Sequence, residues 1–226
     1  LFSAAAKGVD QIVTIPWDES APPAADVAAA MLAAHSGDAL IDWEARVKEL
    51  PAAELRRLFQ AVLGPMSIHD RPPRAAELVQ LRFSMLTSAA CFGQLKRHRM
   101  ASLIPQAYAP ALGPKIPPLV LEAGLTEIFN DVMEQSEALH DKILPRSPAA
   151  AAYVLTQAHR RRVIFSCNAR ELYHVARLRQ DQHAQWDIRA LADQMLAAAR
   201  QELPLTLMLA CGKHCFDEVK EREIGV

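Results

Sequence analysis

The sequence predicts an α/β (α+β) fold that is dominated by helices, in one domain over residues 1–226. Apolar residues recur at helical spacing through most of the chain, and alternating or β-branched segments typical of strands interrupt them at only a few places. The chain shows neither an internal repeat nor a low-complexity linker. A single domain is therefore the simplest architecture.

The composition is that of a globular protein with a sizeable core. Of the 226 residues, 51% are hydrophobic and 23% are charged. The 25 basic and 26 acidic residues give a net charge of -1, which argues against a protein that coats nucleic acid, because such proteins carry a basic excess. No apolar run reaches the roughly 20 residues of a membrane span, and the N-terminus lacks a signal-peptide pattern. We therefore expect a cytoplasmic protein with no membrane partner.

The cysteines predict neither a disulfide framework nor a metal centre. They are Cys91, Cys167, Cys211 and Cys215. Four are too few for a disulfide scaffold at this length, so we interpret them as reduced thiols. The string CGKHC, residues 211–215, offers metal-binding atoms but has no second pair of ligands. The chain starts at Leu1 and not at Met, which fits a processed product or a piece of a longer polypeptide, such as one half of a duplicated chain.

The N-terminal part is predicted to be mostly helical scaffold. QIVTIP, residues 11–16, has the composition of a short strand, and an Ala-rich helix is expected over about residues 24–35. A second helical segment, residues 43–64, is interrupted or restarted at Pro51, because proline is tolerated in the first turn of a helix but not in its interior.

Residues 77–86, ELVQLRFSML, alternate between apolar and polar side chains, as a half-buried strand does. The apolar side consists of Val79, Leu81, Phe83 and Met85. SAACFGQLKRHR, residues 88–99, is predicted to be a helix whose C-terminal end presents Arg97, His98 and Arg99.

The second half of the chain is predicted to contain one more strand among several helices. A long amphipathic helix is expected from Pro117 to about Leu144, with its apolar residues in the core. A helix capped near Ser147 and a β-branched and aromatic strand over residues 163–165 follow. Further helices are expected from about Asn168, from about residue 184 and over residues 205–219.

Arg97, His98 and Arg99 form the first candidate site. A guanidinium group offers a planar fork of donors and stays charged at physiological pH, so two arginines around a histidine can hold phosphate groups. The alternative is a solvated helix end, because cations near a helix C-terminus also gain a few tenths of a kcal/mol from the helix dipole. These residues alone leave both interpretations open.

The second candidate site is NARELYHVARLRQDQHAQWDIRALA, residues 168–192. At ~100° per residue, Asn168 and Arg179 fall within ~20° of each other, at opposite ends of an apolar stripe. Arg170, His174 and Arg177 share the opposite face. One polar surface could face a ligand and the other a neighbouring subunit; the alternative is a solvated helix with ordinary surface arginines.

These two stretches together resemble the flavin-dependent thymidylate synthase (ThyX) family. NARELYHVARLR followed by DQHAQWDIRALA is similar to its C-terminal signature, and residues 97–99 with Ser102 fit the first half of its hallmark RHRxxSxxxxSxR. In the second half Ala107 replaces Ser and Ala109 replaces Arg. The resemblance covers roughly residues 76–200. It implies a ThyX-like fold with a central, mainly antiparallel sheet and long helices.

The resemblance also implies cofactors, substrates and partners. Members of the family are homotetramers that bind FAD at subunit interfaces, reduce it with NADPH, and transfer a one-carbon unit from methylenetetrahydrofolate to dUMP. Gln94 and Arg179 correspond to substrate-binding positions, and Arg179 is also the catalytic candidate; no metal is implied. The positions that correspond to cofactor-binding residues are Arg97, His98, Arg99, Asn168, Arg170, His174 and His183.

The departures from the family pattern leave three functional hypotheses. Ala107, Ala109 and Ala152 stand where the family holds dUMP with polar or charged side chains, and each lost charge-assisted hydrogen bond costs about 1.5–3 kcal/mol. The chain is then an active thymidylate synthase relative, a degenerate domain that contributes flavin-site or oligomer-interface residues, or a flavoprotein with a different, uncharged substrate. The arginines at residues 160–162, on a nearby strand, are candidates to compensate.

Overall fold

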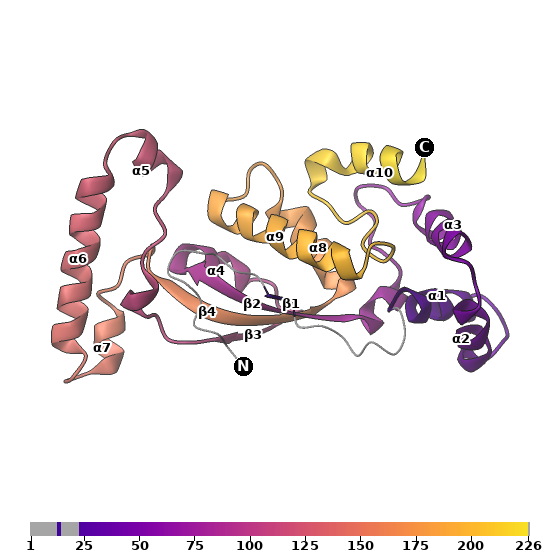
Figure 1. Ribbon diagram of the computed structural model, residues 1–226, viewed down its shortest axis with the longest axis horizontal. Helices are drawn as coiled ribbons and strands as arrows, with labels where there is room; N and C mark the ends of the chain where they lie inside the picture. Colours follow the sequence, from indigo (N-terminus) through magenta and orange to yellow (C-terminus); the bar gives the residue numbers. More distant parts are fainter. Residues whose placement is uncertain (1–12, 15–22, 226) are drawn as a thin grey trace. The chain divides into compact units, whose positions relative to one another are not determined.

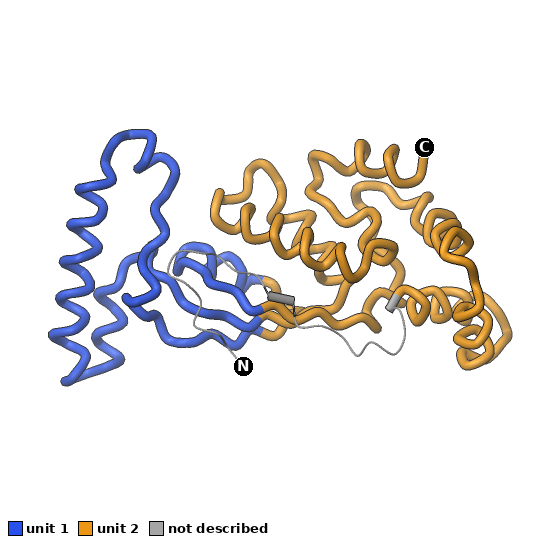
Figure 2. The backbone as a smooth tube through the Cα atoms, in the orientation of Figure 1, with its two compact units in different colours: residues 1–11, 84–97, 103–164 blue, residues 12–83, 98–102, 165–226 orange. Residues whose placement is uncertain are grey.

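The computed structural model describes residues 13–14 and 23–225. The described residues form two compact units, shown in different colours in Figure 2. Unit 1 contains residues 84–97 and 103–164, and unit 2 contains residues 98–102, residues 165–225 and the described residues up to 83. Strands β2 and β4 each contribute residues to both units.

Four strands form one sheet in the order β1-β2-β4-β3 (Figure 1). Their bounds are β1 (Val13–Thr14), β2 (Gln80–Ser88), β3 (Ser102–Pro105) and β4 (Arg160–Asn168). Backbone hydrogen bonds run from Ala169 to Val79 and from Ala89 to His159, so β2 is antiparallel to β4. The small antiparallel sheet confirms the α/β (α+β) prediction. The predicted strand at residues 11–16 is observed at β1; its other residues lie outside the described part.

The helices of unit 2 largely follow the predicted pattern. They are α1 (Pro23–Ala33), α2 (Leu40–Lys48), α3 (Ala52–Leu63), α8 (Ala169–Arg179), α9 (Trp186–Glu202) and α10 (Phe216–Ile224). Pro51 separates α2 from α3 and is the N-cap residue of α3. The proline thus divides the segment as predicted.

The helix expected over residues 205–219 is wrong in its first half. Residues 204–209 form turns, and α10 begins only at Phe216. The hydroxyl group of Tyr173 donates to Thr206 O at 2.9 Å and accepts from Leu209 N at 3.3 Å, so a long-range contact from α8 satisfies this buried backbone. The apolar spacing reflects burial of the turns and not a helix.

Unit 1 contains four helices among its described residues. They are α4 (Ala89–Leu95), α5 (Pro118–Glu122), α6 (Thr126–Ile143) and α7 (Pro148–Ala152), with Ser147 as the N-cap of α7. The predicted single helix over residues 117–144 is therefore two helices. Gly124, with a φ of 68°, lies between them in the left-handed region that ends helices.

Only part of the apolar surface of α6 is in the core. Met133 is buried, but Ile128, Val132 and Leu139 are 62%, 48% and 46% exposed. The expectation that the apolar residues of the segment over residues 117–144 belong to the core is wrong for these three side chains and also for Leu121 and Leu125, which are 54% and 47% exposed. Ile128, Val132 and Leu139 form an outward-facing stripe at spacings of four and seven residues, a helical periodicity.

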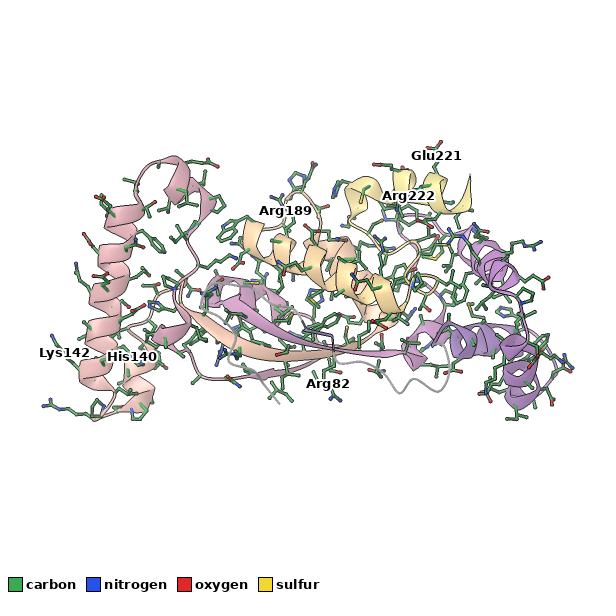
Figure 3. The ribbon with its side chains drawn as sticks, in the orientation of Figure 1. Arg82, His140, Lys142, Arg189, Glu221 and Arg222 are labelled. Atoms are coloured by element: carbon green, nitrogen blue, oxygen red, sulfur yellow. The ribbon has the colours of Figure 1, made fainter. Side chains whose placement is uncertain are left out.

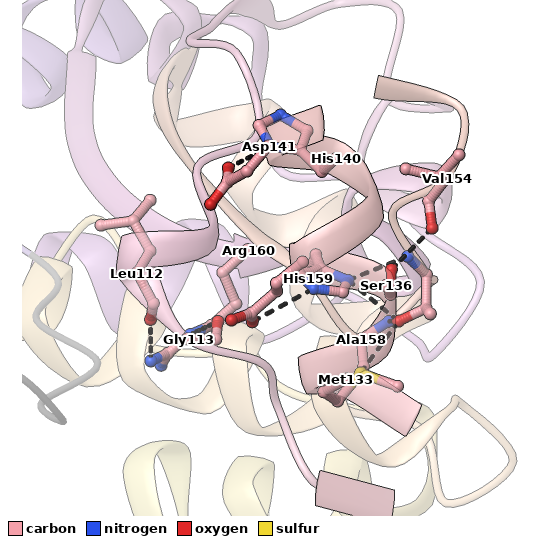
Figure 4. Close-up of polar contacts among 12 residues, drawn as sticks. Leu112, Gly113, Met133, Ser136, His140, Asp141, Val154, Ala158, His159 and Arg160 are labelled. Atoms are coloured by element: carbon pink, nitrogen blue, oxygen red, sulfur yellow. Dashed lines mark hydrogen bonds and ion pairs between the residues drawn. The ribbon is translucent and has the colours of Figure 1, made fainter. Parts of the chain in front are cut away.

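The interior of unit 1 is organised around buried His159 and Arg160 at the start of β4 (Figure 4). Nδ1 of His159 accepts a hydrogen bond from Thr156 N at 2.9 Å, which leaves the proton on Nε2, 3.4 Å from Glu137 on α6. Arg160 Nε donates to Gly113 O at 2.9 Å, and the same guanidinium contacts Leu112 O. These contacts connect β4 with α6 and with the segment that follows β3.

Charged side chains extend from the outer surfaces of several helices (Figure 3). Lys142 on α6 and Glu221 and Arg222 on α10 are exposed examples. Within the described residues, no helix combines the length and the apolar character that crossing a membrane requires.

Candidate functional site

The candidate site in unit 2 is built on the first turns of α8. Asn168 is the N-cap residue of this helix, and its Oδ1 accepts a hydrogen bond from Glu171 N at 2.8 Å. Leu172 and Val175 are each 1% exposed and fix the helix in the core. This helix start therefore gives Glu171 a defined position.

A buried chain of hydrogen bonds connects the RHR segment with α8. Nδ1 of His98 lies 3.0 Å from Oε1 of Glu171, and Nε2 of His98 lies 3.0 Å from Nε of Arg179. The side chains of His98 and Glu171 are 1% and 9% exposed. The structure thus brings together His98 and Arg179, residues of the two stretches that the sequence singled out.

The direction of these hydrogen bonds assigns the tautomer of His98. Arginine Nε always carries a hydrogen and has no lone pair to offer, so Nε2 of His98 must accept. Nδ1 then carries the proton and donates it to the Glu171 carboxylate. A neutral imidazole ring consequently bridges a carboxylate and a guanidinium group, and it orients both ends of the chain.

His174 lies beside this chain, one helical turn beyond Glu171. Its ring meets that of His98 edge-on, with centroids 5.6 Å apart. Partial burial lowers the pKa of His174; the Glu171 carboxylate opposes this shift, and His98 and the guanidinium groups of Arg71 and Arg177 add to it. The charged side chains that act on His174 are thus the guanidinium groups of Arg71 and Arg177 and the buried carboxylate of Glu171.

The face of α8 that carries Arg170 and Arg177 forms hydrogen bonds within unit 2. Arg170 donates from Nε to Pro72 O at 2.9 Å and from Nη1 to Glu77 at 2.7 Å. Arg177 donates to Asp70 O. These contacts attach α8 to the segment before β2 and give both arginines a structural role.

The remaining predicted residues either are exposed in unit 2 or belong to unit 1. Arg99 is exposed directly after His98, and His183 is exposed in the turn after α8, where its backbone N–H donates to Asp181. Gln94, in α4, and exposed Arg97 belong to unit 1.

Glu171 is the site residue that sequence reasoning missed. Its position three residues after the helix-capping Asn168 is that of the glutamate in a capping box, where the carboxylate would bond back to the cap residue. Its backbone N–H does bond to the cap, but its carboxylate bonds to His98 instead. Glu171 differs from an ordinary helix-start glutamate only in that its charged side chain is buried. Burial cannot be inferred from the spacing of residues in the sequence.

His98, Glu171 and His174 also form a group of side chains whose ligand atoms lie within 4.8 Å of one another in the described part of the chain. Both ring nitrogens of His98 are already hydrogen-bonded. The guanidinium group of Arg179 would in addition repel a cation bound beside it. The hydrogen-bond chain explains this cluster without a metal ion.

The donor set suits an anionic, planar ligand. Within unit 2, Arg99 and Arg179 carry guanidinium forks that match phosphate oxygens, and His174 offers an exposed, flat imidazole ring. A flavin dinucleotide combines a pyrophosphate with a planar ring that accepts hydrogen bonds. The side chains present are therefore of the types that such a group requires.

The structure is that of an α+β protein with a candidate site that contains histidine and arginine side chains. The sequence matches the family described as "Thymidylate synthase complementing protein" over residues 20–205. The chain therefore belongs to the flavin-dependent thymidylate synthase family, as a divergent member.

Individual relatives agree with this assignment. The chain is 31% identical over 197 residues to a flavin-dependent thymidylate synthase of Nitratidesulfovibrio vulgaris, which covers 80% of this chain and 78% of that protein. A flavin-dependent thymidylate synthase of Geobacter sulfurreducens is 35% identical over 140 residues, with 57% of this chain and 59% of that protein covered. The UPF0159 protein of Chlamydia pneumoniae is 25% identical over 74% of this chain, which spans only 32% of that longer protein.

A solved structure has a similar fold. It is titled a UMP/dUMP methylase PolB from Streptomyces cacaoi bound with 5-Br dUMP. The match has a TM-score of 0.65 at 18% identity and covers 93% of this chain and 96% of that one. At this identity the likeness supports the ThyX-like fold.

Proposed function

We propose that this chain binds FAD and transfers a one-carbon unit from methylenetetrahydrofolate to dUMP, with NADPH as the reductant. The hydrogen-bond chain of Glu171, His98 and Arg179 carries this proposal, because it joins the RHR segment to the signature helix in one buried arrangement. The family membership and the names of the relatives support it further.

Each residue has a role in this proposal that its chemistry can perform. Arg97 and Arg99 would hold the pyrophosphate of FAD through paired donors. His98, His174, Asn168, Arg170 and His183 would surround the flavin or support its surroundings, while Gln94 and Arg179 would bind the nucleotide. The flavin supplies hydride transfer when it is bound. Arg179 would orient the substrate, because His98 and Glu171 hold its guanidinium group in place.

A visible absorbance spectrum of the purified protein, followed by titration with dUMP, tests the proposal. A flavin spectrum that changes on addition of dUMP is the expected result. A flavin spectrum indifferent to dUMP would instead favour a repurposed flavoprotein with a different substrate. A protein that takes up no flavin, even with added FAD, would contradict the proposal and leave a degenerate, non-catalytic domain.

The substitutions Ala107, Ala109 and Ala152 keep the degenerate domain as a second candidate function. They remove polar contacts from the positions where the family binds dUMP. Such a domain would contribute flavin-site or interface residues to a partner. The experiment above separates the two readings, because a degenerate domain either takes up no flavin or holds a flavin whose spectrum does not respond to dUMP.

We also propose that the chain forms a homo-oligomer, with a tetramer as the expected state, and that its two units act as one domain. The exposed apolar stripe of Ile128, Val132 and Leu139 on α6 supports self-association, because a surface of this kind is typical of an interface. Charge supports a second copy as the occupant. Glu127 and Asp131 lie towards the start of α6 and Lys142 and Arg146 at or beyond its end, so two antiparallel copies would pair opposite charges.

A further inference from the structure

Arg161 lies on β4 next to the segment in which the hallmark motif is altered. Gln106 N donates to Arg162 O at 2.9 Å and Ala109 N donates to Arg160 O at 3.3 Å, so residues 106–109 run beside β4 beyond the end of β3 at Pro105. Arg161 lies between the two acceptors on β4, and Ala107 lies between the two donors. A cation thus stands beside a position that has lost its polar side chain.

The guanidinium group of Arg161 is held in a fixed orientation. Its Cζ lies 4.1 Å from the ring centroid of Tyr108 and 4.9 Å from that of Phe92 on α4. Its Nε donates to Gln106 O at 2.6 Å. Two aromatic rings and one backbone carbonyl therefore restrict the side chain before any ligand arrives, which reduces the entropy that binding would cost.

The terminal fork of this guanidinium has no partner among the described residues. All described contacts of Arg161 use Nε or the face of the guanidinium plane, and no carboxylate lies within ion-pair distance of it in the described part of the chain. Arg160 differs, because its guanidinium donates to the carbonyl groups of Gly113 and Leu112. Arg160 thus holds the segment after β3 in place, whereas the terminal nitrogens of Arg161 are available to a ligand.

A pre-oriented guanidinium with its two terminal nitrogens unused is suited to a phosphate group, which accepts both donors at once. We propose that Arg161 binds the phosphate of the nucleotide substrate and replaces the arginine that is absent at Ala109. This inference rests on the proposed function for the identity of the ligand. The assignment of an anion site to Arg161 rests on the geometry alone and does not depend on the identity of the ligand.

Binding of dUMP, deoxyuridine and inorganic phosphate to the full chain, measured by calorimetry for the wild type and for Arg161→Gln, tests the proposal. We expect Arg161→Gln to weaken dUMP binding roughly 10- to 100-fold, the effect of losing charge-assisted hydrogen bonds. Deoxyuridine lacks the phosphate, so its affinity should not change. Arg161→Lys should recover part of the dUMP affinity, because it keeps the charge but loses the planar fork.

Arg162→Gln is the matched control. Arg162 is an exposed neighbour on the same strand, and strand alternation directs it to the other face. The Arg162→Gln variant should bind dUMP with the same affinity as the wild type. Equal losses in Arg161→Gln and Arg162→Gln would show a general charge effect and would overturn the proposal, as would unchanged dUMP binding in a folded Arg161→Gln.

The two proposals fail in different ways. A flavin-loaded wild type whose dUMP affinity is insensitive to Arg161→Gln leaves the proposed function standing and overturns the role of Arg161. A wild type that takes up no flavin but loses phosphate binding on Arg161→Gln contradicts the proposed function and retains the anion site. If the wild type binds neither dUMP nor phosphate, the anion site itself is refuted.

Discussion

Oε1 of Glu137 lies 3.4 Å from Nε2 of His159, a residue with no solvent exposure. Because Nδ1 accepts from the backbone, Nε2 carries the hydrogen and faces the carboxylate. Nε2 forms no hydrogen bond in the described structure, so Glu137→Leu removes an electrostatic attraction between the carboxylate and this buried N–H group. We expect the free energy of unfolding to fall by up to about 1 kcal/mol, measured by urea denaturation.

Glu134→Leu provides the comparison for this prediction. Glu134 is exposed on the same helix, so its replacement tests the loss of an α6 carboxylate without the histidine contact. Its effect should stay within about 0.5 kcal/mol. Equal effects of the two substitutions would show that the contact between Glu137 and His159 contributes nothing specific.

The tautomer of His98 is a second prediction, measurable by NMR on protein labelled with ¹⁵N-histidine. In the wild type, Nδ1 of His98 should carry the proton, because Nε2 accepts from Arg179. Glu171→Leu removes the acceptor of that proton while Arg179 still donates to Nε2, so the proton should stay on Nδ1 and the Nδ1 signal should shift because its hydrogen bond is lost. Asp193→Asn, which alters an exposed carboxylate of unit 2 that bonds to Gln180, should leave the His98 signals in place. Unchanged signals in Glu171→Leu would refute the assignment.

The lowered pKa of His174 predicts a dependence of stability on pH. In the unfolded chain a histidine titrates near its ordinary value of about 6.5. Between that value and the lower pKa of the folded state, the unfolded chain binds more protons, so the free energy of unfolding rises with pH and falls as the pH drops through this window.

His174→Gln should remove this contribution. Urea denaturation at about pH 7.5 and about pH 5 should therefore show a larger loss of stability on acidification in the wild type than in His174→Gln. An equal or smaller loss in the wild type would contradict the direction of the shift.

The apolar stripe on α6 makes a prediction about assembly. Val132→Glu places a charge in the centre of the stripe, where Val132 is 48% exposed, and should convert the oligomer into smaller species in analytical ultracentrifugation. Asn130→Asp adds the same charge roughly 160° around the helix and should leave the assembly intact. An assembly that survives Val132→Glu would exclude this surface as the interface.

Local patterns were sufficient to predict that most elements exist, but not their bounds. The strand predicted over residues 163–165 is β4 (Arg160–Asn168), and the helix predicted to present Arg97, His98 and Arg99 at its C-terminal end stops at Leu95, so α4 is shorter than expected. Pro51 and Ser147 mark helix starts through backbone geometry and capping, and alternation marked β2. What could not be predicted depends on contacts between distant residues. The Tyr173 hydroxyl group that supports the turns after α9, and the Glu171 carboxylate that bonds to His98 rather than to its own helix, are both of this kind.

The helix break at Gly124 was missed for a different reason. Apolar residues on both sides of Gly124 keep a helical spacing, so the periodicity predicted one helix that continues past the glycine. Its positive φ is a backbone property that spacing does not contain. For the site, the sequence singled out His98 and Arg179, and the structure added the partner that joins them.

Each unit contains a fully or almost fully buried histidine whose proton is fixed by a different neighbour. His159 in unit 1 should carry it on Nε2 and His98 in unit 2 on Nδ1. Their ring nitrogens should therefore give distinguishable NMR signals in one labelled sample. As denaturant is added, loss of one pattern before the other would show the two units melting separately, and simultaneous loss would show that they unfold as one cooperative body.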